Sequence, residues 1–226
     1  MKITEIFYSL QGEGIFAGRP SVFIRIAGCT LRCRWCDTKY AWSDSNANEL
    51  TIDQIVQAAQ KYNCPTFVVT GGEPMVNTQL PELLREFKKT PCHITVETAG
   101  IKFIPNLPCD LMSISPKLSN STPKEASAVK VHNQNCLNID ALENLIRGYH
   151  YQLKFVVDVP EDLKDIQQLL NQLPAVDKER VMLMPQASTR QQYLEKSLMV
   201  ADMCKNTGFS FCQRLHIMLY DDQKGI

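Results

Sequence analysis

The sequence has no excess of charge of either sign. Its 226 residues include 24 Lys and Arg against 24 Asp and Glu, so the formal net charge at pH 7 is zero. A chain without a basic excess produces no general field that would attract a nucleic acid or an anionic membrane surface. The sequence therefore predicts a small-molecule partner, with no nucleic acid and no membrane.

Long apolar runs are missing as well. The stretch from Met1 to Tyr8 has no secretory apolar core, and no later segment is long and apolar enough to span a bilayer. These absences predict a cytoplasmic protein. Hydrophobic residues still make up 44% of the chain, enough to bury a substantial core, and a chain of this length is expected to form one domain over residues 1–226.

A disulfide framework is a poor interpretation, although cysteine is not scarce. The nine cysteines are an odd number, and nothing marks the chain for secretion, where disulfides persist. Only Cys29, Cys33 and Cys36 lie close together in the sequence. The others stand singly, as small buried hydrophobes commonly do: Cys64, Cys92, Cys109, Cys136, Cys204 and Cys212.

After Pro20, apolar segments rich in β-branched residues alternate with stretches of helical spacing, which is typical of βα units around a parallel sheet. The predicted strands are Ser21–Ile26, Phe67–Val69, His93–Val96, Leu111–Ile114, Leu153–Val157, Val181–Met184 and Phe209–Phe211. The predicted helices lie near residues 52–59, 80–87, 139–147, 161–173 and 190–206. The first helix should begin at Thr51, because Gln54 follows it at the spacing of a capping box.

This alternation predicts the fold class. A complete (β/α)₈ barrel takes about 250 residues and eight units, and this chain has fewer units. We therefore expect an α/β fold, an incomplete, open TIM-like βα barrel of about six parallel strands over residues 20–216. Residues 1–19 form an N-terminal extension, residues 217–226 a C-terminal tail, and residues 118–138 a polar interruption of the pattern. Ligands of such sheets bind beyond the carboxyl ends of the strands.

The three clustered cysteines follow the first predicted strand with the spacing Cys-x₃-Cys-x₂-Cys. Cysteine thiolates are the usual ligands of iron–sulfur clusters, and three of them on a four-iron cluster leave one iron open. The amino and carboxylate groups of S-adenosylmethionine can occupy that position, which places the sulfonium for reductive cleavage to a deoxyadenosyl radical. The alternative is a zinc-stabilised binding module, but zinc needs a fourth donor and the first histidine is His93.

With Trp35 before the last cysteine, this motif resembles the radical S-adenosylmethionine (SAM) superfamily. Three further features narrow the resemblance: Leu10–Gly14 upstream, Arg25 on the strand before the cysteines, and Thr38 two residues after them. Together they look like the 7-carboxy-7-deazaguanine synthase family. A protein that activates a glycyl-radical enzyme is the alternative, since such activating proteins carry the same cysteine spacing.

The resemblance implies a radical SAM core, a [4Fe–4S] cluster, S-adenosyl-L-methionine and Mg²⁺. It also implies the reaction of a carbon–nitrogen lyase, in which 6-carboxy-5,6,7,8-tetrahydropterin becomes 7-carboxy-7-deazaguanine and ammonia is released, in the biosynthesis of 7-deazapurines such as preQ₀ and queuosine. The implied partners are an electron donor such as flavodoxin or ferredoxin and a second copy of the chain in a homodimer. No side chain is assigned as catalytic, because the radical carries the chemistry.

The resemblance also assigns residues, and it makes the N-terminal extension a substrate-binding segment. Cluster ligands are Cys29, Cys33 and Cys36, and Thr38 is a ligand of Mg²⁺, a cation that prefers oxygen. Substrate contacts are Leu10, Gln11, Gly12, Arg25 and Thr70, with Arg25 gripping the carboxylate through two hydrogen bonds. S-adenosylmethionine contacts are Trp35, Cys36, Asp37, Gly72, Ser115, Pro116, Lys117, Met184, Pro185, Gln186 and Ala187.

Several of these residues have a plain structural interpretation as well. Arg25 could belong to an ion pair, Thr38 to a loop, and the Gly71-Gly72 pair to a βα turn. Glu97-Thr98-Ala99 also ends a predicted strand at the same edge of the sheet, and its role could be structural. His216, near the C-terminus, could contact substrate or simply face solvent.

Overall fold

The structure is a computed structural model that describes residues 1–45 and 47–223. Its centre is one curved sheet of nine strands in the order β3-β1-β2-β4-β5-β6-β7-β8-β9. The strands are β1 (Lys2–Leu10), β2 (Pro20–Ile26), β3 (Asn48–Glu49), β4 (Thr66–Gly71), β5 (His93–Thr98), β6 (Leu111–Ile114), β7 (Tyr151–Val157), β8 (Val181–Pro185) and β9 (Ser210–Phe211).

Every neighbouring pair from β2 to β9 is parallel, whereas β1 pairs antiparallel with β2 and β3. The two ends of this order do not meet in the described part of the chain, so the sheet is open. All seven predicted strands are present, which confirms the open βα barrel: six parallel strands of four to seven residues and the two-residue β9.

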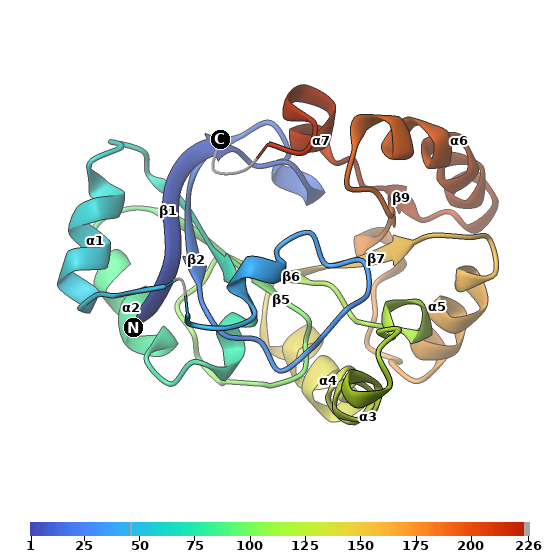
Figure 1. The fold of residues 1–226 in the computed structure, drawn as a ribbon, viewed down its shortest axis with the longest axis horizontal. Helices are drawn as coiled ribbons and strands as arrows, with labels where there is room; N and C mark the ends of the chain where they lie inside the picture. The colour runs from blue at the N-terminus through green and yellow to red at the C-terminus, as the bar shows by residue number, and fades with distance from the viewer. Residues whose placement is uncertain (46, 224–226) are drawn as a thin grey trace.

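Seven helices accompany the sheet in the described residues, and Figure 1 shows most of them along its outer side. They are α1 (Ile52–Gln60), α2 (Leu80–Phe87), α3 (Ala126–Asn135), α4 (Ile139–Gly148), α5 (Asp162–Asn171), α6 (Arg190–Thr207) and α7 (Leu215–Tyr220). Short 3₁₀ turns are η1 (Gly14–Phe16), η2 (Lys39–Ala41), η3 (Pro74–Val76), η4 (Ser119–Ser121) and η5 (Lys178–Arg180). None of the described helices is long and apolar enough to cross a bilayer.

Local sequence explains where these helices begin and which face they bury. The capping box of α1 forms as predicted: the Gln54 backbone N–H donates to Thr51 Oγ1 at 3.2 Å, and the Thr51 N–H donates to Gln54 Oε1 at 2.9 Å. Helix α2 buries its apolar stripe of Leu80, Leu83, Leu84 and Phe87. These stripes pack on the outer face of the strands, so one continuous apolar core lies between helices and sheet.

Two segments differ from the sequence-based expectation. The N-terminal segment contains β1, which pairs with β2 from Ile3 to Leu10, so part of this extension is a strand of the sheet. The interval 118–138, expected only to interrupt the pattern, contains η4 and α3. Helix α3 escaped prediction because it has no apolar stripe: its only buried residue is His132.

Candidate active site

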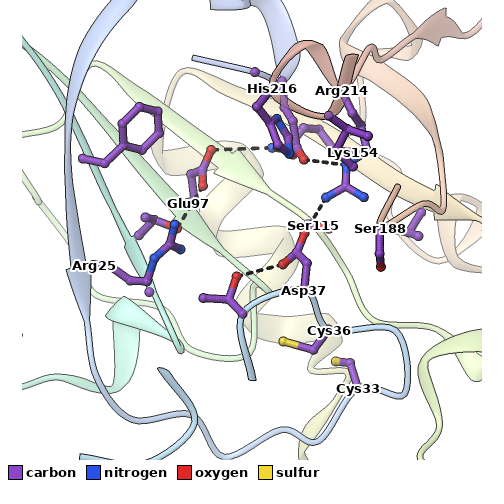
Figure 2. Close-up of a pocket in the computed structure, with 18 of the residues that line it drawn as sticks. Arg25, Cys33, Cys36, Asp37, Glu97, Ser115, Lys154, Ser188, Arg214 and His216 are labelled. Atoms are coloured by element: carbon purple, nitrogen blue, oxygen red, sulfur yellow. Dashed lines mark hydrogen bonds and ion pairs between the residues drawn. The ribbon is translucent and has the colours of Figure 1, made fainter. Parts of the chain in front are cut away.

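A cavity of about 530 Å³ lies at the carboxyl edge of the parallel strands. Its lining comes from β1, from the loop after β2, from the ends of β4 to β8, and from residues around α7. Figure 2 shows the arrangement, with Cys33 and Cys36 at one end and Glu97, Lys154, Arg214 and His216 at the other. Because all these strands are parallel, their carboxyl ends meet at one edge, as the sequence predicted.

The cavity brings together nearly all the residues that the sequence singled out. Every predicted cluster, cofactor, magnesium and substrate residue lines it except Pro116, Pro185 and Ala187. Pro116 and Pro185 are buried where β6 and β8 end. Ala187 packs against Tyr193 and Ile217, and its carbonyl accepts a hydrogen bond from Arg214. These three residues therefore shape the wall of the cavity from behind.

The cysteine loop begins where β2 ends. Gly28 has a φ of 98°, which turns the chain out of the strand, and its backbone N–H donates to the Ala41 carbonyl at 2.9 Å. The second half of the cysteine loop forms a tight turn, in which the Cys36 N–H donates to the Cys33 carbonyl at 3.1 Å. Cys29, Cys33 and Cys36 are free thiols that face the same cavity.

These thiols have the chemistry of iron–sulfur cluster ligands. Burial raises the pKa of Cys29 to about 11 and that of Cys33 to about 12, and it also raises the pKa of Cys36, so a bound metal must displace their protons. No three His, Cys, Asp or Glu side chains among the described residues are grouped to hold one metal ion. In a four-iron cluster each thiolate binds a different iron, and three sulfur donors that face one cavity fit that group.

Gly71 and Gly72 line the cavity, and both positions also require glycine for lack of space. A Cβ on Gly72 would collide with the Gly28 carbonyl, and one on Gly71 would collide with the backbone of Ile26. The close approach lets the Glu73 N–H donate to the Gly28 carbonyl at 2.9 Å. The glycine pair therefore fastens the end of β4 to the start of the cysteine loop.

The buried side chain of Glu73, just after β4, connects this region to the end of β5. It is 1% exposed and accepts hydrogen bonds from Thr98 Oγ1 at 2.6 Å, from the Ala99 N–H at 2.7 Å and from the Met75 N–H at 3.1 Å. Burial raises the pKa of Glu73 despite these bonds. Thr98 and Ala99 thus have a structural role, which was one of the two possibilities that the sequence left open.

The far end of the cavity contains a buried ionic network. Lys154 Nζ lies 2.7 Å from Glu13 Oε2 and 3.7 Å from Glu97 Oε1, and its side chain is only 4% exposed. Arg214 pairs with Glu13 at 3.1 Å and with Asp37. Burial alone would raise the pKa of Glu13, but the charges of Lys154 and Arg214 hold it far below its ordinary range. Glu13 is therefore ionised throughout the physiological pH range.

A set of polar groups with fixed orientation stands beside this network. Glu97 accepts hydrogen bonds from Gln11 Nε2 at 3.2 Å and from Thr70 Oγ1 at 2.9 Å. Gln11 in turn accepts one from the Glu13 N–H at 3.1 Å, which fixes its amide orientation. Gly12 has no room for a Cβ because His216 packs against it. His216 therefore belongs to the cavity, and burial lowers its pKa so that the neutral ring is favoured.

Arg25 and Thr38 lie between the two ends. The Arg25 Nε donates to Glu5 Oε1 at 2.6 Å, and Tyr40 donates to the same oxygen at 2.7 Å. The ion pair that the sequence allowed is thus present, and Figure 2 shows the guanidinium pointing toward the side of the cavity where Glu97 lies. Thr38 donates to Asp37 Oδ1 at 2.8 Å, which leaves the lone pairs of its oxygen for a cation.

The remaining wall near the cysteines is polar and cationic. Lys117 Nζ donates to the hydroxyl of Ser115 at 2.8 Å and lies 5.6 Å from the centre of the Trp35 ring. Gln186 is held by Lys196, whose Nζ donates to its side-chain oxygen at 2.7 Å. Met184 adds an apolar surface. A charged, partly apolar ligand could rest here next to the sulfurs.

Three members of the ionic network, Glu13, Lys154 and Arg214, were not predicted as site residues, whereas Asp37 was predicted to contact S-adenosylmethionine. Glu13 entered only as part of the Leu10–Gly14 segment, and Arg214, two residues before His216, had no sequence signal of its own. Lys154 carried a usable signal, because a lysine within the apolar strand Leu153–Val157 must be paired when the strand is buried on both faces.

Comparisons with known proteins agree with this geometry. A model of the family described as the Radical SAM superfamily matches residues 23–134. A 7-carboxy-7-deazaguanine synthase of Halobacterium salinarum is 36% identical over 236 residues, covering 98% of this chain and 91% of that protein. Another from Rhodopirellula baltica is 36% identical, covering 99% of this chain and 88% of that protein.

Solved structures lead to the same family. The crystal structure of QueE from Escherichia coli matches with a TM-score of 0.73 and 25% identity, covering 95% of this chain and 94% of that one. Membership of the superfamily implies a [4Fe–4S] cluster and S-adenosylmethionine, and the sulfur donors at one cavity fit the cluster. The resemblance inferred from the sequence is confirmed, and the chain belongs to the 7-carboxy-7-deazaguanine synthase family of radical SAM enzymes.

Proposed function

We propose that the chain is a 7-carboxy-7-deazaguanine synthase that converts 6-carboxy-5,6,7,8-tetrahydropterin into 7-carboxy-7-deazaguanine and ammonia, and so acts as a carbon–nitrogen lyase. One observation carries this proposal: a single cavity joins three cysteines at one end to a polar, ion-paired surface at the other. A flat heterocycle with a carboxylate suits the polar end, and a radical source suits the sulfur end. The product belongs to the biosynthesis of 7-deazapurines such as queuosine.

The sulfur end would hold the cofactors. Cys29, Cys33 and Cys36 are the proposed cluster ligands. With S-adenosylmethionine bound, this group supplies a carbon-centred radical that can abstract a hydrogen atom from the substrate. Lys117 and Ser115 offer partners for a carboxylate, Met184 and Trp35 offer an apolar surface, and Gly72 allows close backbone approach.

The polar end would bind the pterin ring. A carboxylate is a good acceptor for the amino group and ring N–H of a pterin, and Glu97 has both oxygens at the cavity between Gln11 and Thr70. Lys154, which also lines the cavity, balances the charge of Glu97. Gln11 and Thr70 can each form a further hydrogen bond. Hydrogen bonds along the edge of the pterin ring would then fix the ring in one orientation.

The substrate carboxylate would meet Arg25. Its planar guanidinium already donates through Nε to Glu5, which holds the side chain in place at the cavity wall. Arginine binds carboxylates through parallel hydrogen bonds, a geometry that lysine cannot reproduce. Thr38 would hold Mg²⁺ together with substrate oxygens, since such cations are commonly bound through few protein oxygens. The Mg²⁺ would then neutralise charge on the same carboxylate.

Three further predictions accompany this proposal. The cluster needs an external electron donor, for which a flavodoxin or a ferredoxin is expected. The resemblance predicts a homodimer, and the sequence predicts a cytoplasmic location.

The experiment that tests the function is anaerobic turnover. The chain is reconstituted with iron and sulfide and incubated with the carboxylated pterin, S-adenosylmethionine, Mg²⁺ and a reductant. We expect a product lighter than the substrate by one ammonia, and no product from a matched variant carrying Cys29→Ala, Cys33→Ala and Cys36→Ala. A colourless protein that binds only zinc would support the binding-module alternative. Inactivity on the pterin, with radical formation on an added protein, would support the activating-protein alternative.

A further inference from the structure

Helix α3 contains a buried histidine that none of the site residues above explains. His132 has no exposed surface, whereas the other side chains of α3 are partly or fully exposed. A helix of this length usually packs through an apolar stripe. In helix α3 the buried position is taken by His132 and not by an apolar stripe. The contacts of the imidazole therefore show how the helix is anchored to the rest of the protein.

Both ring nitrogens of His132 are hydrogen-bonded. The backbone N–H of Arg32 lies 3.1 Å from Nδ1, and because an amide N–H can only donate, Nδ1 must carry the lone pair. The proton then resides on Nε2, which donates to Ser121 Oγ at 3.0 Å. The Ser121 hydroxyl in turn donates a hydrogen bond to the Leu118 carbonyl at 2.6 Å. Burial and the charge of Lys117 lower the pKa of His132, which agrees with this neutral ring.

Arg32 lies inside the cysteine loop, between Cys29 and Cys33. The N–H of its neighbour Leu31 points at Cys29 Sγ, 3.3 Å away, whereas the Arg32 N–H is taken up by the imidazole. The Arg32 guanidinium folds back onto the carbonyls of Cys29 and Leu31 at 2.7 Å each. The conformation of the first half of the loop therefore depends on a side chain that is 100 residues away in the sequence.

The second half of the loop is held by the same segment. The Arg34 N–H donates to the Ser121 carbonyl at 2.9 Å, and Trp35 Nε1 donates to the Asn120 carbonyl at 2.9 Å. Ser121 is itself held by His132. Residues 118–121 and His132 thus form one polar clamp along the outer side of the cysteine loop.

We propose that His132 is a positioning residue for the iron–sulfur cluster: its neutral imidazole binds the Arg32 N–H, holds the Cys29–Cys33 span in shape, and keeps that N–H away from the cluster sulfurs. Hydrogen bonds to sulfur and solvent access both tune the reduction potential of such clusters. His132 therefore influences how tightly the cluster is held and how easily it is reduced. This inference rests on the proposed assignment of the cluster to the three cysteines.

The test compares variants that separate the two hydrogen bonds of the ring. His132→Leu removes both. His132→Asn places a carbonyl oxygen near the position of Nδ1 and so can still accept from Arg32, whereas His132→Gln reaches the position of Nε2 and so favours Ser121. Gln134→Leu, on the exposed side of α3, controls for a new leucine in this helix.

Three readouts apply to the full chain. Hydrogen exchange of the Arg32 amide is measured in the metal-free protein, with the Ala27 amide, which donates to the Lys2 carbonyl at 3.0 Å, as internal reference. Iron loss to a chelator and the midpoint potential, from a redox titration followed by electron paramagnetic resonance, are measured after anaerobic reconstitution. Losing the partner of a buried amide should speed Arg32 exchange and iron loss in His132→Leu by roughly tenfold to a hundredfold. The midpoint potential should rise, because the freed N–H or incoming water stabilises the reduced cluster.

We expect His132→Asn to stay close to wild type in all three readouts, His132→Gln to resemble His132→Leu, and Gln134→Leu to show no change. Unchanged exchange, iron loss and potential in His132→Leu would overturn the inference while leaving the proposed function intact. Rescue by His132→Gln but not by His132→Asn would also overturn it, because the Ser121 contact would then be the important one. A wild-type chain that takes up no iron would contradict the proposed function, and the exchange measurement would still report on the clamp.

Discussion

Lys154 is a buried, charged side chain, and the effect of replacing it on stability can be predicted quantitatively. Its ammonium group is buried on β7, 2.7 Å from Glu13 and 3.7 Å from Glu97. Burial alone would lower the pKa of Lys154, but Glu13 and Glu97 together raise it, so the lysine is charged in the folded protein. Lys154→Met retains much of the side-chain volume and removes only the charge and the hydrogen bond.

The expected cost is large because the carboxylates remain. Glu13 keeps Arg214 as a partner, but Glu97 loses its ion pair with Lys154, and both acidic groups stay in the cavity wall. Removing one member of a buried ion pair typically destabilises a protein by about 3–5 kcal/mol. We therefore expect Lys154→Met to lower the free energy of unfolding by about that amount at neutral pH. The double variant Lys154→Met/Glu97→Gln, which also neutralises the carboxylate left without a cation, should recover part of it.

The penalty should depend on pH with a definite sign. In the wild type the folded-state pKa of Glu13 is depressed, so its ion pairs stabilise the fold above the ordinary carboxyl pKa, and this stabilisation is lost only as the pH falls through the depressed value. In Lys154→Met the pKa of Glu13 rises, so its carboxylate is protonated at a higher pH than in the wild type. The difference in stability should therefore shrink as the pH falls below the pKa that Glu13 has in the variant.

The assay is urea unfolding of the metal-free, reduced chain under anaerobic conditions, followed by fluorescence and circular dichroism together, since coincident curves justify a two-state treatment. Titrations from about pH 7 down to about pH 4.5 give the pH dependence. A loss below about 1 kcal/mol at neutral pH, or a double variant less stable than Lys154→Met, would refute the reasoning.

Three further substitutions test individual residues. Cys33→Ala should abolish the roughly four irons per reconstituted chain, whereas Cys64→Ala, outside the cavity, should retain them; iron analysis that finds both loaded would exclude Cys33 as a ligand. Thr38→Ala should keep iron and S-adenosylmethionine cleavage but lose most of the Mg²⁺ stimulation of product formation, and an unchanged Mg²⁺ titration would remove Thr38 as a cation ligand. Arg25→Lys should weaken binding of the carboxylated pterin by roughly tenfold to a hundredfold with iron content unchanged; an equal loss for an analogue without the carboxylate would show that Arg25 acts elsewhere.

Much of the fold could be predicted because local patterns dictate it. Each predicted parallel strand is a short apolar segment, and buried parallel strands read that way regardless of their neighbours. The start of α1 followed from Thr51 and Gln54 alone. Strand β1 was not predicted because its sequence, Lys2–Leu10, mixes polar and apolar residues, and only pairing with β2 makes it a strand. Helix α3 was missed for a similar reason, since its anchor is one buried histidine.

The candidate site could be predicted where its residues lie in short motifs. The cysteine spacing, the glycine pair and the strand ends all pointed to one edge of the sheet, and the structure places them around one cavity. The ionic network could not be predicted, because Glu13, Lys154 and Arg214 are brought together by the fold from three distant segments. The same holds for His132 and Arg32. Contacts between residues so far apart in the sequence depend on the topology of the whole fold, and a local sequence pattern does not specify that topology.

The central claim is that one cavity holds the cluster and the carboxylated pterin side by side. An anaerobic crystal structure of the reconstituted chain with S-adenosylmethionine and 6-carboxytetrahydropterin tests it most directly. We predict a cluster bound by Cys29, Cys33 and Cys36, the pterin ring hydrogen-bonded to Glu97, and its carboxylate on Arg25. Iron bound by other cysteines, or a pterin bound outside this cavity, would contradict the account.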